Sequence, residues 1–145
     1  MPYQLLRLAD ENGIIIEYHK FQNPQIEAMY IALPDCPPVI GLSTDLCTNI
    51  AHFRTVLAHE LGHHFTTAKS TIGTFLHYRN RIEASREEYR AMRWAANYLI
   101  PTDQLLLALK KGYQIWELAE YFNVDTELVK LKLELTNNLI YKEVS

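Results

Sequence analysis

Residues 55–66 read Thr-Val-Leu-Ala-His-Glu-Leu-Gly-His-His-Phe-Thr, and they contain the pattern HExxH at positions 59–63. On a helix, His59 and His63 lie one turn apart on the same face, where two imidazoles can bind one metal ion. Glu60 is rotated by about 100° from His59, so its carboxylate can reach a metal-bound water without being the natural third ligand. The stretch therefore predicts a metal-binding helix with a general base beside the metal, a combination suited to amide hydrolysis.

The flanks of this motif extend the helix in both directions. Asn49 is a suitable N-cap, and we expect the helix to cover residues 50–66. Gly62 is expected to leave space beside the metal. His52 shares the face of His59 but precedes it by about 10 Å along the axis, so a ligand role for it is disfavoured. His64 lies on another face, and we expect it to point toward solvent or a neighbour.

A second helix is expected from Ile82 to Ile100, because the helical period resumes there and Pro101 ends it. One face of this helix carries Glu88 in a stripe of small residues: Ala84, Ala91 and Ala95. Alanine lets another helix approach closely, where an unpaired carboxylate would be costly and a metal ion would neutralise it. Glu88 is thus our predicted third ligand, which leaves a fourth position open to water. Glu87 is the alternative ligand, and an ion pair of Glu88 with an arginine is the alternative role.

The N-terminal third of the chain indicates one helix followed by a small sheet. Apolar residues on a helical period predict a helix over residues 3–11, which Asn12-Gly13 would end. Short β-branched and aromatic runs predict three strands, at residues 14–18, 28–33 and 39–43. Their short connections favour an antiparallel sheet, and the prolines before residue 39 place the third strand at an edge. At that edge, the third strand could align an extended substrate by strand addition.

Residues 67–81 have no clear period and are expected to form a loop that covers or flanks the metal. Within it, Tyr78 or His77 could donate a hydrogen bond to a developing oxyanion. The simpler interpretation is an aromatic anchor for the loop.

The C-terminal part is expected to be helical. Helices are predicted to about residue 110, then over residues 115–122 and 126–135, and the last two resemble a helix-turn-helix pair. Residues 113–135 nevertheless contain five acidic residues against two lysines, which argues against contact with phosphates. We therefore interpret this part as a packing module or a surface that binds a protein.

The whole-chain properties are those of one globular domain. Its 145 residues are 48% hydrophobic, and the net charge of −3 does not favour binding to nucleic acid or to an anionic membrane. Cys36 and Cys47 match no zinc spacing and are expected to be reduced, partly buried thiols. Neither a signal peptide nor an apolar run of about 18 residues is recognisable, so we expect a cytoplasmic protein.

Two segments together resemble the ImmA/IrrE family of metallopeptidases, which is common in bacteria and their prophages and integrated elements. The first is RTVLAHELGHHF at residues 54–65, and the second is EEYRAMRWAANYLIP at residues 87–101. The later segment IWELAEYFNVDTELVKLKL is similar to the C-terminal helices of that family. The resemblance thus covers nearly the whole chain and is most specific over residues 54–101.

The resemblance implies a zincin-like core around the metal helix. With the elements predicted above, we expect an α+β fold with a small three-stranded antiparallel sheet and several further helices. We expect one domain over residues 1–145, of which residues 102–136 form the C-terminal helical part. His59, His63 and Glu88 would bind Zn²⁺, or alternatively Mn²⁺, and Glu60 would be the catalytic base. Members with known roles cleave or otherwise inactivate a repressor of the helix-turn-helix type, which implies a site-specific endopeptidase with such a repressor as its protein partner. The alternative is a metal-stabilised binding module that inactivates a repressor without proteolysis. The oligomeric state stays open.

Overall fold

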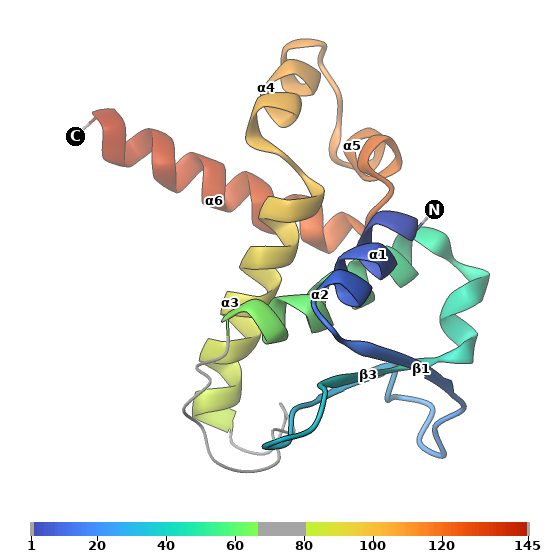
Figure 1. Ribbon diagram of the computed structural model, residues 1–145. Helices are drawn as coiled ribbons and strands as arrows, with labels where there is room; N and C mark the ends of the chain where they lie inside the picture. Colours follow the sequence, from blue (N-terminus) through green and yellow to red (C-terminus); the bar gives the residue numbers. More distant parts are fainter. Residues whose placement is uncertain (1, 67–80, 145) are drawn as a thin grey trace.

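The computed structural model of the chain describes residues 2–66 and 81–144 (Figure 1). Within them the elements are α1 (Tyr3–Glu11), β1 (Ile15–His19), β2 (Ala28–Ile31), β3 (Val39–Ser43), the 3-10 helix η1 (Thr44–Thr48), α2 (Ile50–Thr66), α3 (Arg81–Leu99), α4 (Thr102–Lys110), α5 (Ile115–Phe122) and α6 (Thr126–Val144). The predicted α+β class is confirmed. No helix in the described part of the chain has the length and apolar character needed to cross a membrane. Cys36 and Cys47 are free, and both are exposed instead of partly buried.

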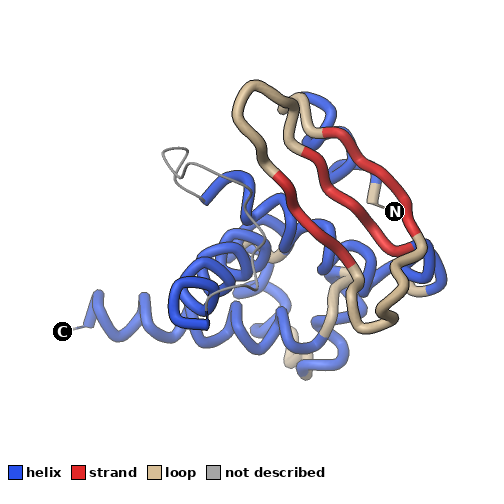
Figure 2. Tube along the Cα trace, turned by 90° about the horizontal axis from the view of Figure 1, so that it is seen from below, coloured by secondary structure: helices blue, strands red, loops and turns tan. Residues whose placement is uncertain are grey.

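The sheet is mixed, and the prediction of an antiparallel sheet was wrong. Its strand order is β1-β3-β2, with β3 antiparallel to β2 and parallel to β1 (Figure 2). β1 and β2 form the two edges of the sheet, and β3, which comes last in the sequence, lies between them. Because this order depends on contacts far apart in sequence, the strand-forming residues alone do not reveal it.

The third strand therefore lies at the centre of the sheet and not at an edge. The prolines are compatible with this position because they precede the first paired residue, Val39. Proline lacks a backbone donor but keeps its acceptor, and the carbonyl of Pro38 accepts a hydrogen bond from Ile15 N at 2.9 Å. β3 begins and ends as predicted, whereas β2 ends two residues early, at Ile31, ahead of a turn in which Asp35 has a positive φ of 61°.

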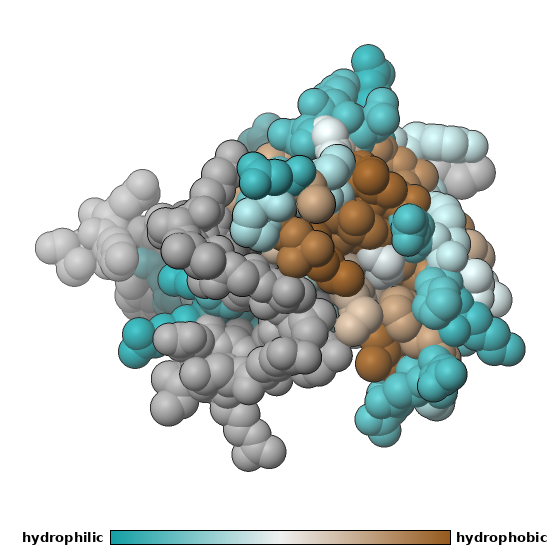
Figure 3. Space-filling view, turned by 60° about the horizontal axis from the view of Figure 1, so that its bottom comes forward, coloured by the Kyte–Doolittle hydropathy of each residue, from teal (hydrophilic) through white to brown (hydrophobic). Residues whose placement is uncertain are grey.

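One side of the sheet packs on helices and forms the core. Ile40 and Leu42 of β3 are fully buried, and Tyr30 of β2 beside them is 4% exposed. Helices α1 and α2 cover this side, α1 against β1 and α2 against β2 (Figures 1 and 2). In the space-filling view that brings the opposite side of the sheet forward, apolar residues also gather on the surface (Figure 3). Ile15 of β1 is exposed, as the alternation of side chains along a strand allows, and so is Leu33, which follows β2.

Helix α2 has the predicted bounds, and its start is fixed by a side chain. Asn49 Oδ1 accepts a hydrogen bond from His52 N at 3.1 Å, which is the predicted N-cap. Helix α3 crosses α2 and packs against it, and α6 packs on α3 and α5 (Figure 1). Helix α6 continues to Val144, well beyond the predicted end at residue 135.

Candidate metal centre

Helix α2 presents two imidazoles on one face. The ring centroids of His59 and His63 are 4.8 Å apart, as expected for residues separated by one helical turn. The side chain of His63 is fully buried and that of His59 is 21% exposed. His63 is therefore the inner and His59 the outer of the two imidazoles.

Glu88 of α3 completes a three-residue group with these histidines. Its Oε2 lies 2.6 Å from His59 Nε2, and its Oε1 lies 3.0 Å from His63 Nε2. One ligand atom from each of the three residues lies within 4.8 Å of the others. Among the described residues, His59, His63 and Glu88 are the histidine, cysteine and carboxylate side chains that could bind a metal ion together. The alternative ligands Glu87 and His52 do not belong to this group.

A close approach of two helices places Glu88 opposite the histidines. A Cβ atom added to Gly62 would lie 2.3 Å from the carbonyl oxygen of Ala91 and 2.9 Å from its Cα. Gly62 precedes His63, and Ala91 follows Glu88 by about one turn of α3. We expected Gly62 to leave space for the metal, but the space is occupied by the backbone of α3. The absence of a side chain at Gly62 thus brings the carboxylate within reach of both imidazoles.

The electrostatics of the three residues suit a divalent cation. Burial on its own would raise the pKa of Glu88, but hydrogen bonds from His59 and His63 lower it well below its usual range. Burial acts to lower the pKa of His59, yet the hydrogen bond to Glu88 and the charge of Glu60 raise it overall. Glu88 is therefore ionised at neutral pH. Two imidazoles and one carboxylate form the donor set of open, tetrahedral zinc sites, so the residues present fit a metal.

Glu60, the residue after His59 on α2, is buried and interacts electrostatically with His59 and Glu88. It is 2% exposed, and burial raises its pKa to about 7, although the nearby charge of His59 acts to lower it. The charge of Glu88 raises the pKa further. A carboxyl group with a pKa near 7 can both take and return a proton at neutral pH, which is what a general base in hydrolysis must do.

His64, which follows His63 on α2, connects this helix to the sheet. Its Nδ1 lies 2.9 Å from the hydroxyl of Tyr30 on β2, and the two rings meet edge to face. This contact bears out the expectation that His64 points to a neighbour. Tyr30 was missed by the sequence analysis, because a tyrosine inside a short strand has no pattern that distinguishes it from a core residue. Tyr78 and His77 lie outside the described residues.

A comparison with protein families agrees with this geometry. A family model described as the IrrE N-terminal-like domain, Peptidase M78, matches residues 9–134. The matched range includes the three residues of the candidate metal group and Glu60. A search of curated proteins found no match.

Proposed function

Because the chain belongs to the Peptidase M78 family of metallopeptidases, we propose that it is a zinc-dependent, site-specific endopeptidase. The observation that supports this most strongly is the convergence of His59, His63 and Glu88 within 4.8 Å. The donor set favours zinc, and Mn²⁺ is the alternative because carboxylate and imidazole ligands also suit it.

In this proposal each residue of the site has one role. His59, His63 and Glu88 bind the metal, and the fourth position is open to water and substrate. A divalent ion held there supplies Lewis-acid polarisation of the scissile carbonyl and of a water molecule. Glu60 takes the proton of the attacking water and returns it to the departing amine. Its burial keeps bulk water from competing for that proton.

The substrate is proposed to pair with β2. The earlier hypothesis that residues 39–43 align it is wrong, because β3 is already paired on both sides. β2 is an edge strand, packs on α2 and is joined to it beside the metal ligands by the contact between Tyr30 and His64. An extended peptide added to this edge would run past the metal with its backbone held by hydrogen bonds.

The proposed substrate is a helix-turn-helix repressor of the same prophage or integrated element. This proposal is supported by the family, whose peptidase activity requires a protein substrate. Because such a repressor works on DNA inside the cell, the enzyme would meet it in the cytoplasm. The acidic character of residues 113–135 favours a role of α5 and α6 in binding this protein over a role in binding DNA.

The proposal is tested by mapping new protein ends. Zinc-loaded wild type and the Glu60→Gln variant are each incubated with native soluble proteins of the host cell, and new N-termini are identified by mass spectrometry. We expect one or a few cleavage sites in one regulatory protein with wild type, and none with the variant. Identical maps for both proteins would refute hydrolysis by this site.

A further inference from the structure

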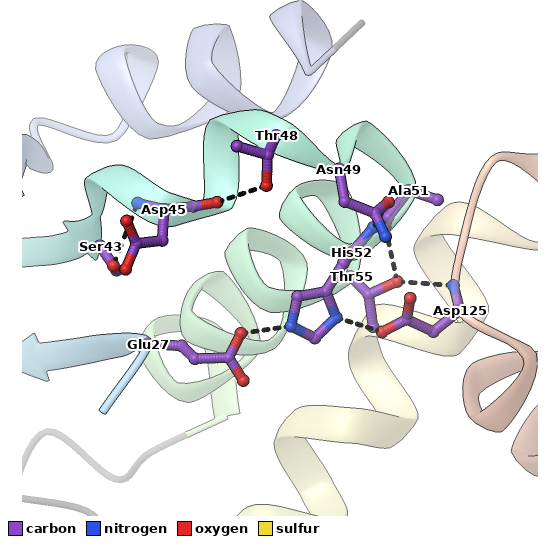
Figure 4. A network of polar contacts seen from close by, with 9 residues as sticks. All are labelled: Glu27, Ser43, Asp45, Thr48, Asn49, Ala51, His52, Thr55 and Asp125. Atoms are coloured by element: carbon purple, nitrogen blue, oxygen red, sulfur yellow. Dashed lines mark hydrogen bonds and ion pairs between the residues drawn. The ribbon is translucent and has the colours of Figure 1, made fainter. Parts of the chain in front are cut away.

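A second polar network lies at the start of α2 (Figure 4). His52 lies between two carboxylates: its Nε2 faces Glu27, and its Nδ1 lies 2.6 Å from Asp125 Oδ2. Glu27 immediately precedes β2, and Asp125 immediately precedes α6. One histidine thus joins the metal helix to the start of an edge strand and to the start of the last helix.

The orientation of His52 is fixed from the α6 side. The backbone N of Asp125 donates to Thr55 Oγ1 at 2.9 Å (Figure 4), and Arg54 Nε donates to the carbonyl of Asn123 at 3.0 Å. These bonds hold the turn before α6 against the first turns of α2. With Asp125 fixed, the imidazole is held so that its other nitrogen points at Glu27.

The network needs a protonated histidine. A neutral imidazole donates from one nitrogen only, whereas an imidazolium donates from both, so both carboxylates are satisfied only by the charged form. Burial lowers the pKa of His52, but the hydrogen bonds to Asp125 and Glu27 raise it above its ordinary value of 6.5. Asp45 of η1 lines the same cavity of about 220 Å³ as His52 and Glu27 and adds negative charge there. Arg54, the nearby cation on α2, is directed to Asn123.

Two polar contacts between side chains therefore join residues 27–30 to α2. One is the contact from Glu27 to His52, and the other is the contact from Tyr30 to His64. His52 and His64 are twelve residues apart, which is about 18 Å along a helix. The metal ligands His59 and His63 lie between them. The two contacts consequently join residues 27–30 to positions of α2 that precede and follow His59 and His63.

We propose that the imidazolium form of His52 is a positioning residue, which holds the start of β2 and so determines where an added substrate strand lies relative to His59 and His63. This inference rests on the proposed function, in which β2 pairs with the substrate. His52 touches neither metal nor substrate and acts through Glu27. The contact is intact below pH 6.5 and is lost as the pH rises through the raised pKa of His52, when the ring gives up one of its two protons.

Amide hydrogen exchange of the zinc-loaded full chain tests the link without any substrate. We expect His52→Gln to lower the protection factors of the β2 amides by about tenfold at pH 6.5, the factor for one charge-assisted hydrogen bond. Glu27→Gln should lower the protection factors of the same β2 amides and leave those at the start of α6 unchanged. In wild type the β2 protection should fall between pH 6.5 and pH 9, and in His52→Gln this pH dependence should disappear. His19→Gln, which changes an exposed histidine on β1, is the matched control and should behave as wild type.

Kinetics then test the role in substrate positioning. Once a cleaved protein has been mapped, His52→Gln should raise KM for it more than it lowers kcat, because strand docking is weakened while the metal group is intact. Unchanged protection of the β2 amides in His52→Gln would show that the contact between His52 and Glu27 does not hold β2. An unchanged KM would contradict the role of His52 in substrate positioning. If the wild-type protein cleaves nothing, the proposed function is wrong and so is the positioning role. Hydrogen exchange would still show whether His52 holds β2 through Glu27.

Discussion

Gly62 is the residue on which the distance between α2 and α3 depends most directly. We predict that Gly62→Ala lowers the free energy of unfolding by about 1–3 kcal/mol and weakens zinc binding, because the new Cβ would overlap a backbone carbonyl that no rotamer change can move. Urea unfolding and zinc titration measure the two effects. Gly41→Ala is the control, since a Cβ there would meet Phe21 Cζ at an ordinary 3.5 Å. Equal loss in both variants would show that the close approach at Gly62 has no special importance.

Glu88 is predicted to be a metal ligand, and its neighbour offers a matched control. Glu88→Gln keeps the shape of the side chain but removes its charge. The zinc affinity should fall by at least about 100-fold, since even the loss of an outer-shell partner costs up to that factor. Glu87→Gln, on the adjacent face of α3, should bind zinc as wild type does. Elemental analysis of proteins purified without added metal, followed by competition with a chelator, gives both values. Equal zinc content in wild type and Glu88→Gln would exclude Glu88 as a ligand.

Individual residues of the site could be predicted from the sequence where their chemistry coincides with the helical period. His59 and His63 are recognisable because two histidines one turn apart have few structural reasons to occur together. Glu88 was found as a charge in a stripe of alanines, and the structure brings it to the two histidines. The contacts of His52 with Glu27 and Asp125 could not be anticipated, since each joins residues far apart in sequence and no local pattern marks them.

Among the secondary-structure elements, β2 has backbone groups available for a substrate. Ser43 N donates to the carbonyl of Glu27 at 2.8 Å, so these two residues form a hydrogen-bonded pair. Pairs alternate along an antiparallel ladder, which makes Met29 and Ile31 the next residues bonded to β3. The backbone groups of Ala28 and Tyr30 therefore point to the open edge.

This alternation gives a test of strand addition. Ala28→Pro removes one outward N–H from β2 and leaves its bonds to β3 in place. We predict a decrease in kcat/KM for the protein substrate of about 3- to 10-fold, the effect of one lost hydrogen bond, with little change in thermal stability. Met29→Pro, which removes a bond inside the sheet, should instead lower the melting temperature. Wild-type kcat/KM in a correctly folded Ala28→Pro protein would argue against pairing at this edge.

The elements themselves were largely predictable, and their order in the sheet was not. Helix α2 and strand β3 have the expected bounds because local signals mark their ends, namely the cap at Asn49 and the prolines before Val39. The pairing of β1 with β3 depends on how the chain crosses from β1 to β2, which is a property of the whole core. Because β3 is the central strand, the strand proposed to pair with the substrate is β2 and not residues 39–43.

For the molecule as a whole, residues 2–66 and 81–144 offer a sheet edge and the two helices with the candidate metal ligands, but little wall for a deep general cleft. Binding energy should then come from a folded partner that docks outside the scissile bond and positions it. We predict that denatured casein is digested negligibly, while the mapped protein is cleaved at one or a few bonds. Gel and mass-spectrometric time courses with Glu60→Gln as the blank measure both. Efficient Glu60-dependent digestion of casein would show that specificity does not depend on docking.

Hydrolysis of the purified substrate protein in water enriched in ¹⁸O distinguishes proteolysis from inactivation by binding. If the metal group and Glu60 add water to a peptide bond, the new C-terminus formed by zinc-loaded wild type carries one ¹⁸O atom, and Glu60→Gln and Glu88→Gln yield no fragments. A wild-type protein that binds its partner tightly and leaves it intact under these conditions would contradict proteolysis and favour inactivation by binding alone.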